Sequence, residues 1–192
     1  ETSGSIISPS RAQSLVGIRP TVGLVAGYGI APIRASQDTA GPMDRTVANA
    51  AMTLQSIAGP DPINDAYYAR YWGSLDPAKV VTPAPATVPD YMGALDLNFV
   101  RGKRIGWNGN TPQILEAKAA LEAAGAILVE RPVINPGTMP ALSGQGEQHM
   151  AIDLYYQRLG AGAPIKSLAK EVADNQANAH EALKFGNNSH LN

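Results

Sequence analysis

The chain has 192 residues, of which 44% are hydrophobic and 16% charged, and its formal net charge at pH 7 is −1. This length and apolar content suit one domain, or part of a larger one, with a buried core. No basic stripe follows any predicted helix and no apolar run approaches about 18 residues, so the sequence lacks the marks of a nucleic-acid-binding protein and of a membrane span.

The residue types restrict the chemistry further. There is no cysteine, which excludes disulfides, thiolate nucleophiles and Cys-ligated zinc but leaves the compartment open. His149, His180 and His190 show no metal-ligand spacing such as HExxH, so we expect no metal. Neither a G-x-G-x-x-G motif nor a P-loop is present, and we expect no cofactor.

Both ends of the chain read as cut. The sequence opens at Glu1 without a methionine, signal peptide or transit peptide, and its first residues already have the composition of a functional loop. Residues 186–192 stop without a closing element. We therefore expect the N-terminal and C-terminal parts of the same protein to be missing from this chain, which would be a partial domain over 1–192.

Residues 1–59 combine small residues with short apolar pieces. Two β-branched runs, 16–18 and 22–25, predict short strands bounded by proline and glycine. Helical spacing of apolar residues begins at Asp44, the expected N-cap, and runs to Ala58, where a Gly-Pro pair ends it. We expect this segment to carry a signature loop, strands and a helix.

The composition of residues 60–98 predicts an irregular excursion, that is, a long segment without regular helices or strands. Prolines recur through it, and it is long for a loop inside a compact domain. The segment 99–130 then predicts a βαβ unit with parallel strands at 103–107 and 126–129. Pro112 suits the first turn of its helix and Gly125 the residue after the last turn. A helical region over 131–192 should hold helices at about 145–159 and 167–185.

The segment 1–9 (ETSGSIISP) could carry chemistry. Glycine allows backbone angles and close approaches that other residues do not, and successive N–H groups in such a turn can form an anion-binding nest. A nucleophilic serine needs an exposed Oγ and donors aimed at the developing oxyanion. The alternative is an ordinary serine-rich turn, which composition alone favours.

Four blocks resemble the second half of the signature of the amidase signature family: 1–6 (ETSGSI), 15–24 (LVGIRPTVGL), 36–43 (SQDTAGPM) and 45–48 (RTVA). Residues 97–106, 123–129 and 167–185 are similar to the middle of bacterial peptide amidases. The resemblance covers nearly the whole chain, and its signature blocks are highly specific. It implies an α/β fold with a mixed, mostly parallel sheet surrounded by helices, present here as a fragment.

The resemblance also implies a mechanism. The family uses a serine nucleophile, a second serine preceded by a cis peptide bond, and a lysine. Ser5 matches the nucleophile, and Glu1 falls at an acidic position that fixes loop geometry. The loop whose backbone amides form the oxyanion hole corresponds to Thr2, Ser3, Gly4 and Ser5.

The chain departs from the family in one large respect. The lysine and bridging serine lie in a Gly-Gly-Ser-Ser-Gly region and an earlier segment, and neither is in this sequence. None of its lysines sits in the family's context. They are Lys79, Lys103, Lys118, Lys166, Lys170 and Lys184. The chain alone is therefore expected to be inactive.

Other polar residues have two interpretations. Gln37 and Asp38 could brace the active-site loops or only form a turn before the helix, and the structural role is favoured. His149 is expected at a solvated or core-edge position, and Tyr155 and Tyr156 in packing. The Asn-Asn-Ser triplet at 187–189 fits the glycosylation pattern, which is too short to be specific.

We predict a serine-dependent amide hydrolase that forms an acyl-enzyme on Ser5 and acts on a small-molecule carboxamide or a peptide amide. One alternative is the A-type subunit of an amidotransferase acting on charged tRNA, whose usual loop (SDTGGSIRQP) differs from residues 1–9. Another is a relative that kept the fold as a binding or scaffold protein and lost the base.

Overall fold

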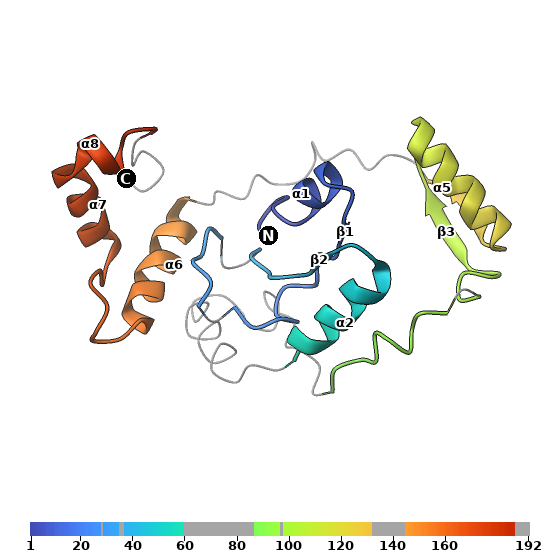
Figure 1. Cartoon of the computed structure of the whole chain (residues 1–192), viewed down its shortest axis with the longest axis horizontal. Helices are drawn as coiled ribbons and strands as arrows, with labels where there is room; N and C mark the ends of the chain where they lie inside the picture. Colours follow the sequence, from blue (N-terminus) through green and yellow to red (C-terminus); the bar gives the residue numbers. More distant parts are fainter. Residues whose placement is uncertain (28, 35–36, 60–86, 97, 132–144, 187–192) are drawn as a thin grey trace. The chain divides into compact units, whose positions relative to one another are not determined.

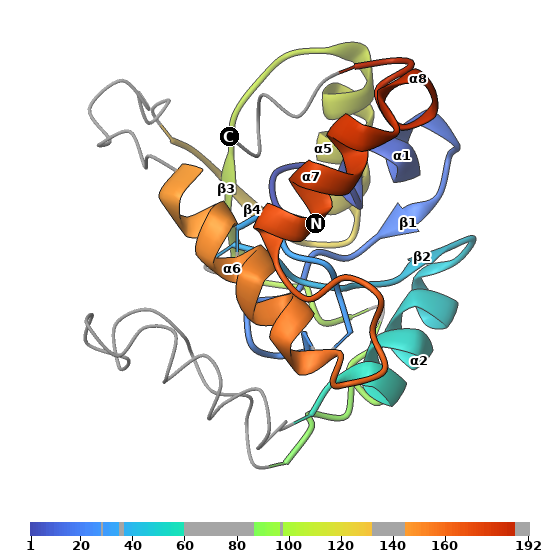
Figure 2. The same ribbon diagram turned by 90° about the vertical axis from the view of Figure 1, so that its left-hand side faces the viewer.

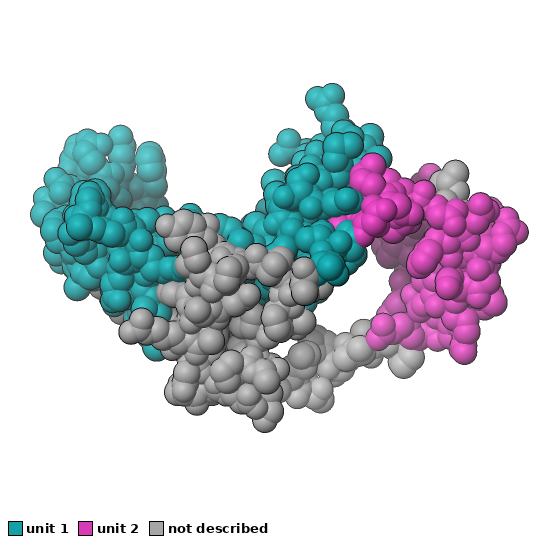
Figure 3. Space-filling model, turned by 90° about the horizontal axis from the view of Figure 1, so that it is seen from below, with its two compact units in different colours: residues 1–89, 142–192 teal, residues 90–141 magenta. Residues whose placement is uncertain are grey.

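The computed structural model describes residues 1–27, 29–34, 37–59, 87–96, 98–131 and 145–186, without the side chains of 145–147 (Figure 1). By their contacts the residues divide into two compact units, Glu1–Pro89 with Leu142–Asn192 and Asp90–Ala141 (Figure 3). Each unit is described by itself.

The first helix, α1 (Ile7–Ala12), begins directly after the signature loop and was not predicted from the sequence. The residue before it, Ile6, is only 4% exposed. A Cβ added at Gly17 would lie 3.2 Å from Cγ2 of Ile6, and one added at Gly41 would lie 3.0 Å from its Cδ1. The two glycines therefore leave the space that Ile6 fills.

Strands β1 (Val16–Gly17) and β2 (Met43–Asp44) pair antiparallel, with Val16 opposite Asp44. Their path brings Gly41 against residue 18, since an added Cβ at Gly41 would lie 2.2 Å from the Ile18 carbonyl oxygen. The predicted strand at 22–25 is wrong. Residues 21–24 form a turn closed by a 3.0 Å bond from the Leu24 N–H to the Thr21 carbonyl, and only Val25 bridges to Ala58.

Helix α2 (Val47–Ile57) buries Ala50, Ala51 and Leu54 along one face. The apolar spacing predicted a face of Val47, Ala51, Leu54 and Ile57, but Val47 is 57% and Ile57 39% exposed, so that prediction holds only for Ala51 and Leu54. Its N-cap is Thr46, whose side chain accepts a hydrogen bond from the Asn49 N–H, so the prediction of Asp44 as N-cap is wrong. Asp44 is instead held extended by its pairing in β2, two residues before the cap.

The second unit contains the predicted βαβ segment. Strands β3 (Arg104–Trp107) and β4 (Ile127–Glu130) pair parallel over four residues, and α5 (Pro112–Ala123) connects them. Pro112 stands in the first turn after the N-cap Thr111. Gly125 follows the helix with φ 88°, a conformation that favours glycine, so both helix ends form as predicted.

Three helices follow, α6 (Gln145–Arg158), α7 (Leu168–Ala177) and α8 (Ala179–Ala182), and α6 contacts α7 (Figure 2). The predicted helix 167–185 is thus interrupted at Asn178. Ser167 caps α7, while the Asp153 carboxylate in α6 accepts a 2.7 Å bond from the Leu168 N–H.

Helices beside antiparallel and parallel strand pairs confirm the α/β class. Within the described part of the chain, no helix combines the length and apolar character that a membrane crossing requires. Most of the predicted excursion, 60–86 and 97, lies outside the described residues, as does the triplet 187–189. The division of one partial domain into four segments stays a prediction.

Candidate functional site

The signature loop begins with a backbone pairing between two distant residues. The Glu1 amino group donates to the Thr39 carbonyl, and the Thr39 N–H donates to the Glu1 carbonyl over 3.1 Å. Thr39 is 5% exposed. The start of the loop is therefore fixed against residues that lie 38 positions farther along the chain.

The Glu1 carboxylate fixes the other end of the loop. Its Oε2 accepts hydrogen bonds from the N–H groups of Ile6, over 2.7 Å, and Ile7, over 2.8 Å. Its Oε1 lies 3.3 Å from Nε of Arg19, and the Glu1 side chain is 5% exposed. Burial by itself would raise the pKa of this carboxyl, but the two backbone donors and the Arg19 charge outweigh it, and the pKa is lowered.

Between these two fixed points stands Ser5. Gly4 precedes it with φ 155°, and the Gly4 carbonyl accepts a 2.8 Å bond from the Ser8 N–H as α1 begins. Ser5 is exposed, while Ile6 after it is buried. No described residue accepts a hydrogen bond from the N–H groups of residues 2–5. Within the described part of the chain, these donors are unpaired.

Asp38 connects this loop to a second one. Its Oδ1 accepts a hydrogen bond from the Thr2 hydroxyl. Its Oδ2 accepts from the N–H groups of Ile33, over 2.8 Å, and Arg34, over 3.0 Å. One carboxylate therefore holds the loop 1–5 and the loop that ends at 34 at a fixed separation.

Gln37 contributes through its backbone. Its carbonyl accepts a 2.9 Å bond from Nη2 of Arg19, and the same guanidinium reaches Glu1. Arg19 was not singled out in the sequence. An arginine isolated between two apolar segments was the only signal in the sequence that could have pointed to it. Its partners could not be read from that signal, because they are a carboxylate 18 residues before it and a carbonyl 18 residues after it.

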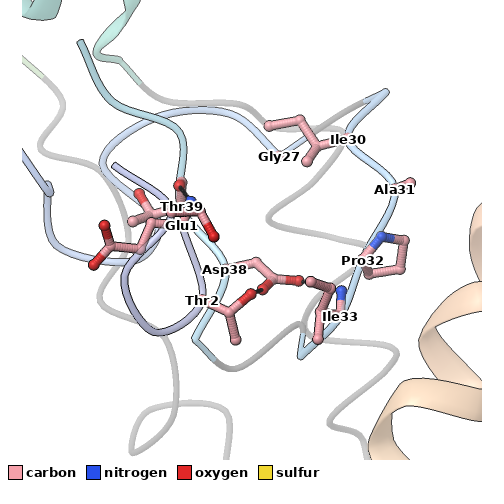
Figure 4. A pocket seen from close by; sticks show the side chains of 10 residues that line it. Glu1, Thr2, Gly27, Ile30, Ala31, Pro32, Ile33, Asp38 and Thr39 are labelled. Carbon is pink, nitrogen blue, oxygen red and sulfur yellow. Dashed lines mark hydrogen bonds between the residues drawn. The ribbon is translucent and has the colours of Figure 1, made fainter. Parts of the chain in front are cut away.

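A cavity of about 140 Å³ opens beside the loop (Figure 4). On one side stand Glu1 and Thr39, with Thr2 and Asp38 joined by a hydrogen bond. Four apolar residues follow one another along the facing loop, a wall that the sequence analysis missed. The lining comprises Glu1, Thr2, Ser5, Gly27, Ile30, Ala31, Pro32, Ile33, Asp38 and Thr39.

The structure thus brings together the sequence-predicted residues Glu1, Ser5 and Asp38 and leaves His149 apart from them. His149 lies in a shallow groove between α6 and α7, and its Nε2 is buried with no hydrogen-bond partner among the described residues. In the described part of the chain, no three His, Asp or Glu side chains are grouped as metal ligands.

The two predicted packing tyrosines form an edge-on pair with ring centroids 5.7 Å apart. Tyr156 does more than pack, because burial and a hydrogen bond to Glu171 of α7 raise its pKa to about 12. This contact joins α6 to α7 and involves none of the residues that line the cavity beside Ser5.

Comparisons with known proteins identify the family of this chain. A family model described as Amidase matches residues 1–143. A protein of Arthroderma benhamiae named as an amidase is 43% identical over 141 residues, covering 68% of this chain and 22% of its own length. The A-type subunit of glutamyl-tRNA(Gln) amidotransferase from Myxococcus xanthus is 37% identical over 153 residues, covering 74% of this chain and 28% of its own.

Among solved structures, native peptide amidase from Stenotrophomonas maltophilia matches with a TM-score of 0.78 and 37% sequence identity. The match covers 100% of this chain and 38% of the peptide amidase. The chain belongs to the amidase family. It spans between 22% and 38% of the lengths of these three relatives.

Proposed function

We propose that this chain supplies the nucleophile and the oxyanion donors of a serine amidase. The Ser5 Oγ attacks the carbonyl carbon of a carboxamide, and the serine proton passes to a base and then to the leaving nitrogen. The C–N bond breaks, ammonia or an amine leaves, and water hydrolyses the ester on Ser5 to release the acid.

One observation carries the proposal. Ser5 is exposed on a cavity and belongs to a run of backbone N–H groups with no acceptor among the described residues. The N–H groups of Ile6 and Ile7, by contrast, are both bound to Glu1. Within the described residues, the loop therefore keeps unpaired donors at residues 2–5, next to Ser5 in the chain, and a tetrahedral oxyanion needs such donors.

Glu1, in this proposal, positions the loop and does not react. Its lowered pKa keeps it ionised at neutral pH, and both of its oxygens are engaged. A carboxylate in that state is a poor proton acceptor. We infer that the base and the relaying serine come from segments outside these 192 residues, so that this chain alone is inactive.

The test uses the full-length protein and a fluorophosphonate probe, which reacts covalently with activated serines. Wild-type protein should be labelled, and Ser5→Ala should abolish labelling. Ser8→Ala, which removes another exposed hydroxyl one turn away in α1, is the matched control and should label like wild type. Equal labelling of the Ser5→Ala and wild-type proteins would remove Ser5 from the mechanism.

An amidotransferase component is the second candidate, because a protein with that name is 37% identical over 153 residues. Ammonia release from simple amides, measured without partner proteins, separates the two functions. Release supports the hydrolase. A protein that labels with the probe but releases no ammonia would support the amidotransferase component, and a wild-type protein that does not label would support a non-catalytic relative.

A further inference from the structure

The wall of the cavity that faces the Ser5 loop is apolar throughout. It consists of Ile30, Ala31, Pro32 and Ile33, which follow one another along the chain (Figure 4). Ile30 is 42% exposed and Ile33 52% exposed, and both line the cavity. Large apolar side chains left in contact with solvent beside a reactive group favour contact with a ligand over a purely structural role.

The wall is held in place before any ligand arrives. The Ile33 N–H donates to Asp38 Oδ2 over 2.8 Å, and the Ile30 N–H donates to the Gly27 carbonyl over 3.2 Å. Asp38 in turn accepts from Thr2 in the signature loop. The distance between wall and nucleophile loop is therefore set by hydrogen bonds within the protein, so binding costs little reorganisation.

The charged groups of the cavity are already paired within the protein. The Glu1 oxygens are occupied by two backbone donors and Arg19, and the Asp38 oxygens by Thr2 and two backbone donors. The Thr39 hydroxyl donates to the Ala40 carbonyl. Two carboxylates with their donors already in place disfavour an anionic group, and they leave the apolar wall as the binding surface.

The size of the cavity indicates the size of the group. Its volume is about 140 Å³. An apolar cavity of about 150 Å³ in a protein is large enough to bind benzene. For a primary amide the leaving group is ammonia, which needs no such space, so in these substrates the acyl side is the part that can fill the cavity.

Resting on the proposed function of Ser5, we propose that this cavity is an acyl-group specificity pocket. It takes an uncharged aryl or branched-alkyl group about as large as a phenyl ring, and Ile30 and Ile33 determine the preference. The preferred substrates are then carboxamides such as benzamide, ahead of acetamide and of amides whose acyl group carries a carboxylate.

The test measures kcat/KM of the full-length protein on benzamide, acetamide, succinamate and acetanilide. We expect benzamide to exceed acetamide and succinamate by about tenfold or more, the range for apolar groups filling a pocket. Ile33→Ala should remove about tenfold on benzamide while acetamide stays within about twofold. Ile30→Ala is the second variant, and Ile57→Ala, which truncates a 39%-exposed isoleucine of α2, is the matched control.

Equal kcat/KM for benzamide and acetamide in the wild-type protein would overturn the proposal, and so would equal losses on both substrates in the two wall variants. An effect of Ile33→Ala on acetanilide alone would also overturn it, because it would place the pocket on the amine side. Fluorophosphonate labelling of the same samples keeps the two proposals distinct. Labelled protein without an acyl preference rejects the pocket and retains the Ser5 nucleophile.

Discussion

The loop around Ser5 and the parallel unit at 104–130 are stabilised in opposite ways. In the first, the Asp38 carboxylate joins residues 36 positions apart, and one backbone pairing joins residues 38 positions apart. In the second, two strands pair over four residues by backbone hydrogen bonds, and the connecting helix is closed at its ends by Thr111 and Gly125.

This difference predicts which property a single substitution should change in each region. A backbone ladder does not depend on which side chains it carries, so changes in the parallel unit cost modest stability. The loop depends on two carboxylates, each of which binds groups in two different segments through its two oxygens. Changes there should move the reacting groups and reduce turnover, since small displacements in a site have large kinetic costs.

The largest effect is expected at the nucleophile. Ser5→Ala removes the attacking oxygen, and kcat on any amide substrate should fall by about 10⁴- to 10⁶-fold, the scale of a catalytic serine. Steady-state kinetics of the full-length protein measure this, with Ser8→Ala as the reference. A loss below about tenfold would break the comparison, because the loop would then have no special kinetic role.

Glu1 should come next. Glu1→Ala leaves the Ile6 and Ile7 N–H groups without their acceptor, and kcat should fall by about 10²-fold as Ser5 shifts. Glu1→Gln keeps an amide oxygen that can accept these bonds and loses the Arg19 ion pair, so it should retain more activity. If the two variants lost activity equally, the charge, and not the hydrogen bonds, would position the loop.

Glu1 also predicts a pH dependence of stability. Its pKa in the folded protein is lowered below the ordinary 4.5, so its stabilising contribution is complete above pH 4.5 and is lost as the pH falls through the lower folded-state value. Thermal unfolding at pH 7 and at about pH 3 should show a smaller acid-induced loss in Glu1→Gln than in wild type. An identical loss would assign acid sensitivity to other groups.

Thr2 should have a smaller effect that separates hydrogen bonding from packing. Thr2→Val keeps the shape and removes the hydroxyl that donates to Asp38, and kcat/KM should fall by about tenfold, the value of a hydrogen bond to a charged group. Thr2→Ser keeps the donor and should stay near wild type. Equal losses in both would mean that the methyl group matters more than the bond.

The smallest kinetic effect is expected in the parallel unit. Gly125→Ala places a Cβ at φ 88°, 3.3 Å from Cγ of Arg101, and should cost about 1 kcal/mol of unfolding free energy in denaturant titration. Activity should stay within about twofold. A kinetic loss as large as that of Thr2→Val would contradict the separation between the two regions.

The same difference explains what the sequence could predict. In the parallel unit, proline in the first helical turn and glycine after the last one are local signals, and the elements formed where these residues indicated. Helix α1 was missed because its Ser-Pro-Ser composition is typical of a turn. The N–H groups of Ile6 and Ile7 at its start are bound by Glu1, a residue that precedes the helix and is not part of its periodic pattern.

The site shows the same limit. Glu1, Ser5 and Asp38 stand in signature blocks and were identified from them. Arg19 also stands in such a block but was not singled out, because its importance lies in contacts with a carboxylate and a carbonyl 18 residues away on either side. The wall at 30–33 was missed because its role depends on the cavity that it lines. The strand at 22–25 was wrong for a related reason: its β-branched residues predicted extension, but the Thr21–Leu24 bond closes a turn there.

The crossing of Gly41 over residue 18 has a consequence for the use of this structure with relatives. One carbon atom added at position 41 would lie 2.2 Å from a carbonyl oxygen and 2.7 Å from the ring of Pro20, neither of which belongs to a flexible side-chain tip. A homologue with any side chain at that place must hold the two segments farther apart. The packing around Ile6, which Gly41 contacts, must then differ as well. The residue at position 41 is therefore a quick criterion for deciding which homologues can inherit the geometry described for Ser5.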